Sequence, residues 1–462
     1  MATYHEFIED SFPFPNKEFE VNGNELLFND VDIMQLIEKH GTPLRITYLP
    51  KISTQITKAK NYFKSAFQKH NYKGDYLYTY CTKSSHFKFV LEETLKCDTH
   101  IETSSAFDMA IVKRLYKEQK IDKQTYIIAN GFKRPLYTKY LSELINDGFN
   151  NCIPVIDNLN EIDVYEKHLN KDCQIGIRVA TEEDPSFNFY TSRLGIRYAD
   201  VSNFYQSKIK NNSRFNLKLL HFFINTGIQD NAYYWNELTR FVELYCELKK
   251  LAPEIDTIDI GGGLPIKTSL IFDFDYQKII DSIIETIKKT CDRNNVDTPN
   301  IISEFGSFTI GESGAMVYKV LDQKLQNDKE LWYMIDGSFI TNLPDTWALN
   351  QRFIMLAINN WNKEYQRVNL GGLTCDSKDY YNWESHSSEI LLPKSQKDTP
   401  QYIGFFHTGA YQEALGGYGG VQHCLIPSAK HIILSKNENQ ELIDSVHREE
   451  ESEETMLSIL GY

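Results

Sequence analysis

The sequence lacks closely spaced cysteines, an excess of positive charge and long apolar runs. Its eight cysteines are scattered through 462 residues without any CxxC spacing. They therefore indicate no metal site and no disulfide framework, and we expect reduced thiols in a cytoplasmic protein that needs no metal. A formal net charge of −14 disfavours a nucleic-acid or anionic-membrane partner, because phosphate groups are bound by clustered lysine and arginine.

No stretch of about 18 apolar residues predicts a membrane span. The first residues contain acidic side chains and no apolar run, so we expect no signal peptide. Hydrophobic residues, in contrast, make up 41% of the chain, with 28 tyrosines and 27 phenylalanines among the residues available to line cores and clefts. This content is enough for a full core and two domains.

From about residue 76, short β-rich runs alternate with amphipathic segments. This alternation predicts a parallel sheet, and eight repeats of it predict a closed (β/α)8 barrel of the TIM type. The expected strands are Tyr76–Cys81, His100–Thr103, Tyr126–Asn130, Cys152–Ile156, Gln174–Val179, Leu219–Ile224, Ile255–Ile260 and Ile301–Glu304.

The remaining sequence has a different pattern. After about residue 311, β-rich segments such as Trp332–Ile335 and Tyr402–Phe406 are separated by polar loops without regular helices between them. We therefore predict residues 46–310 as the barrel and 311–462 as an all-β domain. Residues 1–45 would pack with the β domain, and the acidic run at 448–454 would form a solvated helix face in its tail.

Reactive groups in such a barrel sit at the C-terminal ends of its strands. Lys83 closes the first strand, where partial desolvation would favour a nucleophilic amine. Gly261, Gly262 and Gly263 follow the seventh strand and could offer backbone amides to a phosphate, or could simply form a tight turn. Thr226 and Gly227 end the sixth strand, where a second phosphate contact is possible.

Two further features carry chemistry. Glu304 ends the eighth strand, and a carboxylate facing the barrel centre needs a partner such as a protonated pyridine nitrogen. In the β domain, Cys375 stands beside Asp376 in the string CDS, as a usable proton donor or as a structural cysteine in a turn. The convergence of these clusters carries the functional argument.

The order of lysine, GGG, glutamate, CDS and GAY resembles the fold-type III pyridoxal-phosphate (PLP) enzymes over roughly residues 40–435. Within that group, three strings are similar to those of biosynthetic arginine decarboxylases: LPDTWALNQRF (343–353), LTCDSKD (373–379) and GFFHTGAYQEALG (404–416). The resemblance implies the alanine racemase/ornithine decarboxylase-like fold, a PLP cofactor and the decarboxylation of an amino acid.

The resemblance also implies residue roles. Lys83 would bind the cofactor covalently, Glu304 would hold the pyridine nitrogen protonated, and Cys375 would reprotonate Cα after CO2 loss. The cysteine of this family reaches the partner subunit's site, so a homodimer with shared active sites is implied. The other implied cofactor contacts are Glu102, Arg178, Phe223 (where the family usually has a stacking histidine), Thr226, Gly261, Gly262, Gly263 and Tyr411.

Charge favours a basic substrate. Diaminopimelate enzymes resemble one another in using arginines at two positions that are occupied here by Ser307 and Asp345. Asp376, with Asp336 or Asp345, remains to face a distal cation, and a guanidinium would pair with carboxylates through bidentate hydrogen bonds. We therefore expect arginine to be converted to agmatine, in polyamine biosynthesis.

Some points stay open. Ser307 also replaces an arginine that helps to bind phosphate in the family, and the chain is shorter than most biosynthetic arginine decarboxylases. Diaminopimelate, ornithine, lysine or carboxynorspermidine are alternative substrates. A PLP racemase or a non-catalytic regulatory homologue are alternatives of other classes, which the presence of Lys83 and the CDS string disfavours.

Overall fold

The computed structural model describes residues 2–182, 190–396, 399–418 and 422–462, and the chain divides into two compact units. Unit 1 comprises Met1–Lys51, Ile266–Asp273 and Ile310–Tyr462, and unit 2 comprises Ile52–Pro265 and Phe274–Thr309. Residues 46–51 and 266–273, which the sequence pattern assigned to the barrel, belong to unit 1. Leu270, for example, packs against the hydrophobic core of unit 1.

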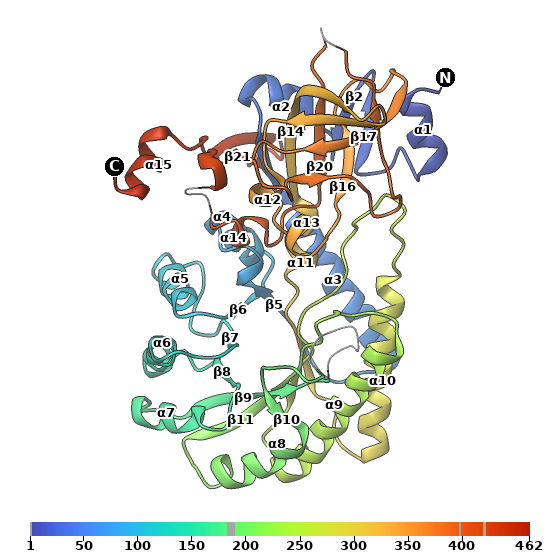
Figure 1. The fold of residues 1–462 in the computed structure, drawn as a ribbon. Coiled ribbons are helices and arrows are strands. Elements are labelled where there is room, and N and C mark those ends of the chain that lie inside the picture. The colour runs from blue at the N-terminus through green and yellow to red at the C-terminus, as the bar shows by residue number, and fades with distance from the viewer. Residues whose placement is uncertain (1, 183–189, 397–398, 419–421) are drawn as a thin grey trace. The chain divides into compact units, whose positions relative to one another are not determined.

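Unit 2 is a closed parallel barrel of eight strands surrounded by helices, as predicted (Figure 1). The strands follow each other in chain order around the barrel, and β8 pairs with β9 to close the ring in the order β9-β11-β12-β13-β5-β6-β7-β8. The barrel strands are β5 (Tyr76–Cys81), β6 (His100–Thr103), β7 (Ile127–Ala129), β8 (Cys152–Ile156), β9 (Cys173–Ala180), β11 (Phe215–His221), β12 (Thr257–Asp259) and β13 (Asn300–Ser303), while β10 (Ile196–Arg197) adds to β9.

The helices of unit 2 cover the barrel with their apolar faces. In α10 (Tyr276–Asn294), isoleucines 279, 280, 283, 284 and 287 recur at helical spacing and are all buried. Asp275 caps the start of this helix, and Asn295 ends it in a left-handed conformation. The other helices are α3 (Leu49–His70, whose first turn counts with unit 1), α4 (Lys88–Leu95), α5 (Ala106–Lys117), α6 (Pro135–Asn146), α7 (Glu161–His168), α8 (Tyr198–Phe204), α9 (Ala232–Leu251) and α11 (Ser307–Ile310).

One predicted strand differs clearly from the structure. We expected Leu219–Ile224, but β11 begins at Phe215 and ends at His221. After His221 the backbone leaves the sheet, and Gly227 then lies so close to Gly263 that a Cβ atom on either residue would clash with the other. Thr226 and Gly227 therefore lie in the loop after β11 and do not end the strand.

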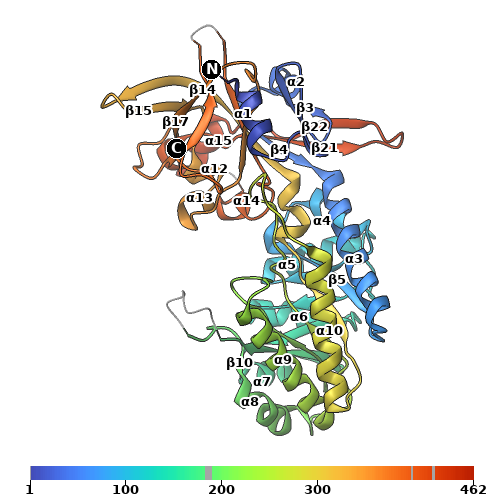
Figure 2. The same ribbon diagram turned by 90° about the vertical axis from the view of Figure 1, so that its right-hand side faces the viewer.

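Unit 1 is rich in β structure, and Figure 2 shows the hairpin of β21 and β22 extending from its main sheet. That sheet has the order β18-β17-β15-β14-β4-β21-β22, with β20 also paired to β14. Its strands are β4 (Leu44–Tyr48), β14 (Gly314–Gln326), β15 (Glu330–Ile335), β16 (Ile354–Ala357), β17 (Tyr365–Gly371), β18 (Tyr380–Tyr381), β19 (Ile390–Pro393), β20 (Tyr402–Phe406), β21 (Lys430–Lys436) and β22 (Leu442–Arg448).

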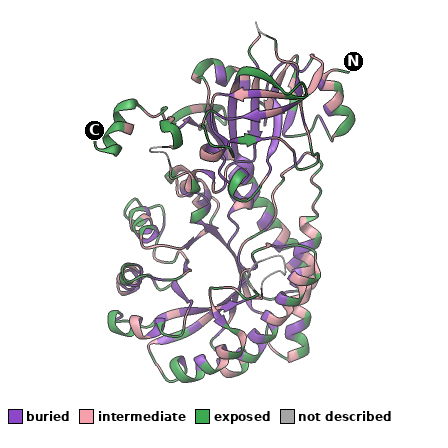
Figure 3. Cartoon of the chain, viewed as in Figure 1, coloured by how far each residue is buried: buried purple, intermediate pink, exposed green. Residues whose placement is uncertain are grey.

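The N-terminal segment forms part of unit 1 and contributes β4 to its main sheet. Before β4 it forms a small sheet of β1 (Phe19–Asn22), β2 (Glu25–Phe28) and β3 (Val31–Asp32), between α1 (Tyr4–Ser11) and α2 (Ile33–His40). The short helices α12 (Phe339–Asn342), α13 (Asp345–Ala348) and α14 (Gln412–Leu415) and the terminal α15 (Glu453–Leu460) complete the unit. In both units the strands are mostly buried and the outer helix faces exposed (Figure 3).

A cluster of four charged side chains is buried in unit 1. Lys51 Nζ lies 2.7 Å from Glu18 Oε1 and 3.0 Å from Glu312 Oε2, and His407 Nε2 lies 3.0 Å from Glu18 Oε1. His407 Nδ1 donates to the backbone carbonyl of Lys267, so both ring nitrogens face acceptors and the ring is an imidazolium. Two cations thus balance two anions, which meets the requirement that buried charges be paired.

Candidate active site

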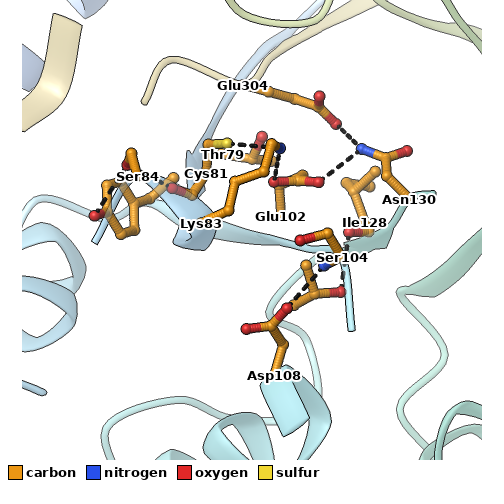
Figure 4. Close-up of polar contacts among 12 residues, drawn as sticks. Thr79, Cys81, Lys83, Ser84, Glu102, Ser104, Asp108, Ile128, Asn130 and Glu304 are labelled. Carbon is orange, nitrogen blue, oxygen red and sulfur yellow. Dashed lines mark hydrogen bonds and ion pairs between the residues drawn. The ribbon is translucent and has the colours of Figure 1, made fainter. Parts of the chain in front are cut away.

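The candidate site lies at the C-terminal ends of the barrel strands, where Lys83, Glu102, Asn130 and Glu304 approach one another (Figure 4). Lys83 follows β5 and Glu102 lies in β6, whereas Asn130 and Glu304 directly follow β7 and β13. Parallel strands end at one rim of a barrel, so residues separated by more than two hundred positions meet there. Sequence spacing alone could not place these side chains together, but the barrel topology does.

Lys83 is held by an ion pair. Its Nζ lies 3.0 Å from Glu102 Oε2 and 2.9 Å from Cys81 Sγ. Glu102 is completely buried, whereas the Lys83 side chain is 46% exposed. The amine is therefore fixed in position by a buried anion and still accessible to a reacting molecule.

Asn130 connects the lysine side of the site to Glu304. Its Nδ2 donates to Glu102 Oε1 at 3.1 Å and to Glu304 Oε1 at 2.6 Å, as Figure 4 shows. No role was predicted for Asn130 from the sequence. It could have been found by the rule that selected Lys83 and Glu304, because it also closes a barrel strand.

Glu304 stays ionised although it is buried. Burial alone would raise its pKa, but His221, whose Nε2 lies 3.2 Å from Glu304 Oε2, together with Lys83 and Asp259, lowers it to about 2. Burial and the charge of Glu304 raise the pKa of Asp259, so Asp259 carries the proton. The pair thus presents one anion at the rim, next to the imidazole of His221.

The glycine loop is shaped by close backbone contacts. Gly261 and Gly263 have φ angles of 66° and 98°, and a Cβ atom on Gly262 would lie 2.5 Å from the Glu304 carbonyl oxygen. Gly261 N–H donates to Asp259 Oδ1, so the amide of the first glycine is already used. Among the described residues, the N–H groups of Gly262 and Gly263 have no such partner, and they can bind an anion.

These residues fit the cofactor that the motifs imply. A buried ionised carboxylate suits a protonated pyridine nitrogen, and unpartnered glycine amides suit a phosphate. The Nδ1 atom of the buried His221 also has no hydrogen-bond partner among the described residues, which leaves a polar atom available beside Glu304. Phe223 and Thr226, two of the predicted contacts, lie half-buried in the loop after β11, and Arg178 lies in β9.

The comparisons with known proteins agree with this geometry. Residues 53–311 match the family model described as pyridoxal-dependent decarboxylase, pyridoxal binding domain. The chain belongs to this family. It is a PLP-dependent enzyme of the decarboxylase type, and the matched residues include every predicted site residue of the barrel unit.

Relatives match along nearly the whole chain. The biosynthetic arginine decarboxylase of Prochlorococcus marinus (strain MIT 9215) is 24% identical over 97% of this chain and 89% of its own length. Biosynthetic arginine decarboxylase 2 of Synechocystis sp. is 22% identical over 94% of this chain and 84% of its own. The first alignment extends over 584 positions, more than the chain has residues, so the relative contains insertions that this chain lacks.

Solved structures show the same fold. The biosynthetic arginine decarboxylase of Campylobacter jejuni superposes with a TM-score of 0.82 at 18% identity, over 100% of this chain and 92% of its own. A diaminopimelate decarboxylase from M. jannaschii gives 0.78 at 18% identity, over 96% of this chain and 97% of its own. These pyridoxal-dependent decarboxylases share the barrel-plus-β-domain fold predicted from the sequence.

The other predicted site residues lie in unit 1. Cys375 and Asp376 are exposed in the loop between β17 and β18, and Tyr411 precedes α14 with a φ angle of 67°. Asp336 accepts hydrogen bonds from Thr42 and from the backbone N–H of Lys319, so its carboxylate already has partners within unit 1.

Asp345 is buried and also partly engaged. Its Oδ2 accepts from Gln412 Nε2 at 2.7 Å, and burial raises its pKa. Its Oδ1 has no hydrogen-bond partner among the described residues. Asp345 is thus better placed than Asp336 to accept a hydrogen bond from a further group.

Among the residues that the structure describes, no helix is both long and apolar enough to span a membrane.

Proposed function

We propose that this pyridoxal-dependent enzyme decarboxylates arginine to agmatine and CO2. The observation that carries the choice of substrate is the near-complete match to relatives named biosynthetic arginine decarboxylase. The acidic residues Asp345 and Asp376 support it, because a distal guanidinium would pair with carboxylates that a distal carboxylate would leave unpaired. Agmatine as a polyamine precursor and a cytoplasmic location are part of the same proposal.

Bound PLP supplies an electron sink for the charge that CO2 loss leaves on Cα. Lys83, Glu304, Gly262 and Gly263 would hold it, with Arg178, Phe223, Thr226, Gly261 and Tyr411 as further contacts. Glu102 and Asn130 link Lys83 to Glu304 through hydrogen bonds and so fix the lysine relative to that carboxylate. The low pKa of Glu304 keeps its carboxylate able to accept a hydrogen bond from a cationic ring. Cys375 would deliver a proton to Cα, and Asp376 beside it would face the substrate's cationic end.

CO2 release tests the proposal directly. The PLP-loaded protein is offered arginine, ornithine, lysine and meso-diaminopimelate in parallel. We expect release from arginine, with agmatine as product, at a kcat/KM at least about tenfold above the others, which needs about 1.4 kcal/mol of discrimination. Release mainly from diaminopimelate would refute the interpretation of Ser307 and Asp345.

Two lysine variants test the covalent role. Lys83→Ala should remove the visible absorbance of lysine-bound cofactor, whereas Lys88→Ala should retain it. Lys88 is a suitable control because it lies on the neighbouring helix α4, where it pairs with Glu118 at 2.7 Å on the surface. Unchanged absorbance in Lys83→Ala would assign the cofactor to another lysine.

The homodimer with shared active sites is tested by mixing two inactive variants. Lys83→Ala and Cys375→Ala chains are unfolded and refolded together. If each site takes its lysine from one subunit and its cysteine from the other, half of the dimers are mixed and each contains one complete site. We expect recovery of about a quarter of wild-type activity for a two-fold dimer. No recovery from a mixture that refolds to dimers would argue against sharing.

A further inference from the structure

Two cysteines and a histidine meet on the surface of unit 1. Cys375 Sγ lies 3.4 Å from Cys424 Sγ and 4.0 Å from His423 Nε2, and one ligand atom from each residue lies within 4.8 Å of the other two. All three residues are exposed. Cys375 and Cys424 are 49 positions apart, so the absence of CxxC spacing concealed the cluster in the sequence.

Hydrogen bonds hold the backbone on the Cys375 side of the cluster. Asp379 is buried and accepts hydrogen bonds from the backbone N–H and the hydroxyl of Thr374, the residue before Cys375. On the other side, His423–Leu425 form a short 3-10 turn in which Cys424 has a φ angle of 60°. Cys375 N–H also points at Cys424 Sγ, at 3.4 Å. The contact thus joins the loop between β17 and β18 to the turn at His423–Leu425.

We infer that Cys375, Cys424 and His423 form a binding site for Zn²⁺. In a tetrahedral site with Zn–S of about 2.3 Å and Zn–N of about 2.0–2.1 Å, neighbouring ligand atoms are about 3.5–3.8 Å apart. The observed 3.4 and 4.0 Å lie on either side of this range, so shifts of a few tenths of an ångström are enough. A donor set of two sulfurs and an imidazole nitrogen favours Zn²⁺ over Mg²⁺ or Ca²⁺.

The charge balance also suits the ion. Binding displaces one proton from each thiol, and two thiolates then neutralise the metal while the imidazole binds as a neutral ligand. In the single chain the three protein ligands are exposed, so a fourth position is open to water.

Zinc at this site would control the enzyme. This part of the inference rests on the proposed function, in which Cys375 delivers the proton to Cα. A thiolate coordinated to Zn²⁺ has no proton to give and is withdrawn from the substrate. Zn²⁺ should therefore inhibit decarboxylation, and removing Cys424 or His423 should relieve the inhibition without removing Cys375.

Metal binding is measured first and independently of activity. The reduced holoenzyme is titrated with Co²⁺, followed by its thiolate charge-transfer absorbance, and with Zn²⁺ by equilibrium dialysis. We expect one ion per chain. Cys424→Ser and His423→Gln should each weaken metal binding by more than about 100-fold. Even the loss of a residue that only hydrogen-bonds to a metal ligand lowers metal affinity by about 10- to 100-fold. Cys97→Ser, which removes a partly exposed thiol outside the cluster, serves as the control and should bind as the wild type.

Activity is measured second. One equivalent of Zn²⁺ should lower the rate of CO2 release by the wild type and by Cys97→Ser. The factor by which the rate falls should be at least tenfold larger for these two proteins than for Cys424→Ser. Zinc binding to a protein that decarboxylates no amino acid would keep the metal site and refute the proposed function. Failure to bind either ion, or equal binding by Cys424→Ser, would overturn the metal site. The metal site would also be overturned if Cys375 and Cys424 formed a disulfide in peroxide but bound no zinc after reduction.

Discussion

Lys51→Met tests how the buried charge cluster stabilises unit 1. The substitution keeps the length of the side chain but removes the cation that lies 2.7 Å from Glu18 and 3.0 Å from Glu312. At an effective dielectric constant near 20, each contact corresponds to about 6 kcal/mol of Coulomb attraction, most of which offsets the desolvation of the charges. Removing one member of a buried ion cluster typically costs about 3–5 kcal/mol, because one carboxylate is then left without a balancing cation.

Urea unfolding followed by tryptophan fluorescence measures this loss. Four of the five tryptophans are in unit 1, and replacing Trp235 by Phe in every sample leaves only those four as reporters. Lys39→Met is the matched control. Lys39 also pairs with a carboxylate at 2.8 Å, that of Asp444, but its side chain is 60% exposed and the loss should stay below about 1 kcal/mol.

A second substitution distinguishes charge imbalance from poor packing. In the Lys51→Met background, Glu312→Gln leaves Glu18 paired with His407 and should recover part of the lost stability, with a coupling of about 1–3 kcal/mol. The reasoning would be refuted if Lys51→Met cost no more than Lys39→Met, or if Glu312→Gln only added to its loss.

Three further predictions concern pH and the site. Burial would lower the pKa of His407, but Glu18 and Glu312 raise it. The contribution of His407 to stability is therefore complete below its unfolded pKa of about 6.5 and is lost as pH rises through the folded value. In urea unfolding, the stability difference between wild type and His407→Gln should shrink with rising pH, and a difference that grows would contradict the ion pair. Asn130→Ala removes hydrogen bonds to two carboxylates and should weaken PLP binding or kcat by about 10- to 100-fold, from the 1.5–3 kcal/mol of bonds to charged groups, as fluorescence titration and steady-state kinetics would show. Asp376→Asn should weaken arginine binding by about 2–5 kcal/mol if this residue pairs with a buried cation, and an unchanged KM would assign specificity to another residue.

The barrel was predictable because each of its strands is a short apolar run followed by a helix. All eight expected runs overlap a strand, and the one clear displacement, at β11, arose because Phe222 and Ile224 continue the apolar pattern after the backbone has turned away from the sheet. Apolar content reports burial, and a buried loop beside a glycine contact looks like a strand in sequence.

The site was only partly predictable for a different reason. Lys83 and Glu304 stand at recognisable strand ends, but the links through Asn130, His221 and Asp259 depend on which rim positions face each other. Cys375 was identified from its string, whereas its contact with Cys424 was hidden by 49 intervening positions. Long-range side-chain geometry has no local signature in a single sequence.

The position of β4 has a consequence for synthesis. This strand is almost entirely buried in the main sheet of unit 1, where Leu44 pairs with Val317 on one side and with Lys430 on the other. At a ribosomal rate of about 5–20 residues per second, its second neighbour is made roughly 20–80 seconds later. Both edges of this apolar strand are open until β14 is made, and one edge stays open until β21 follows, a condition that favours aggregation. The barrel can close while β4 waits, so the nascent chain needs protection at its N-terminal segment more than at its catalytic core.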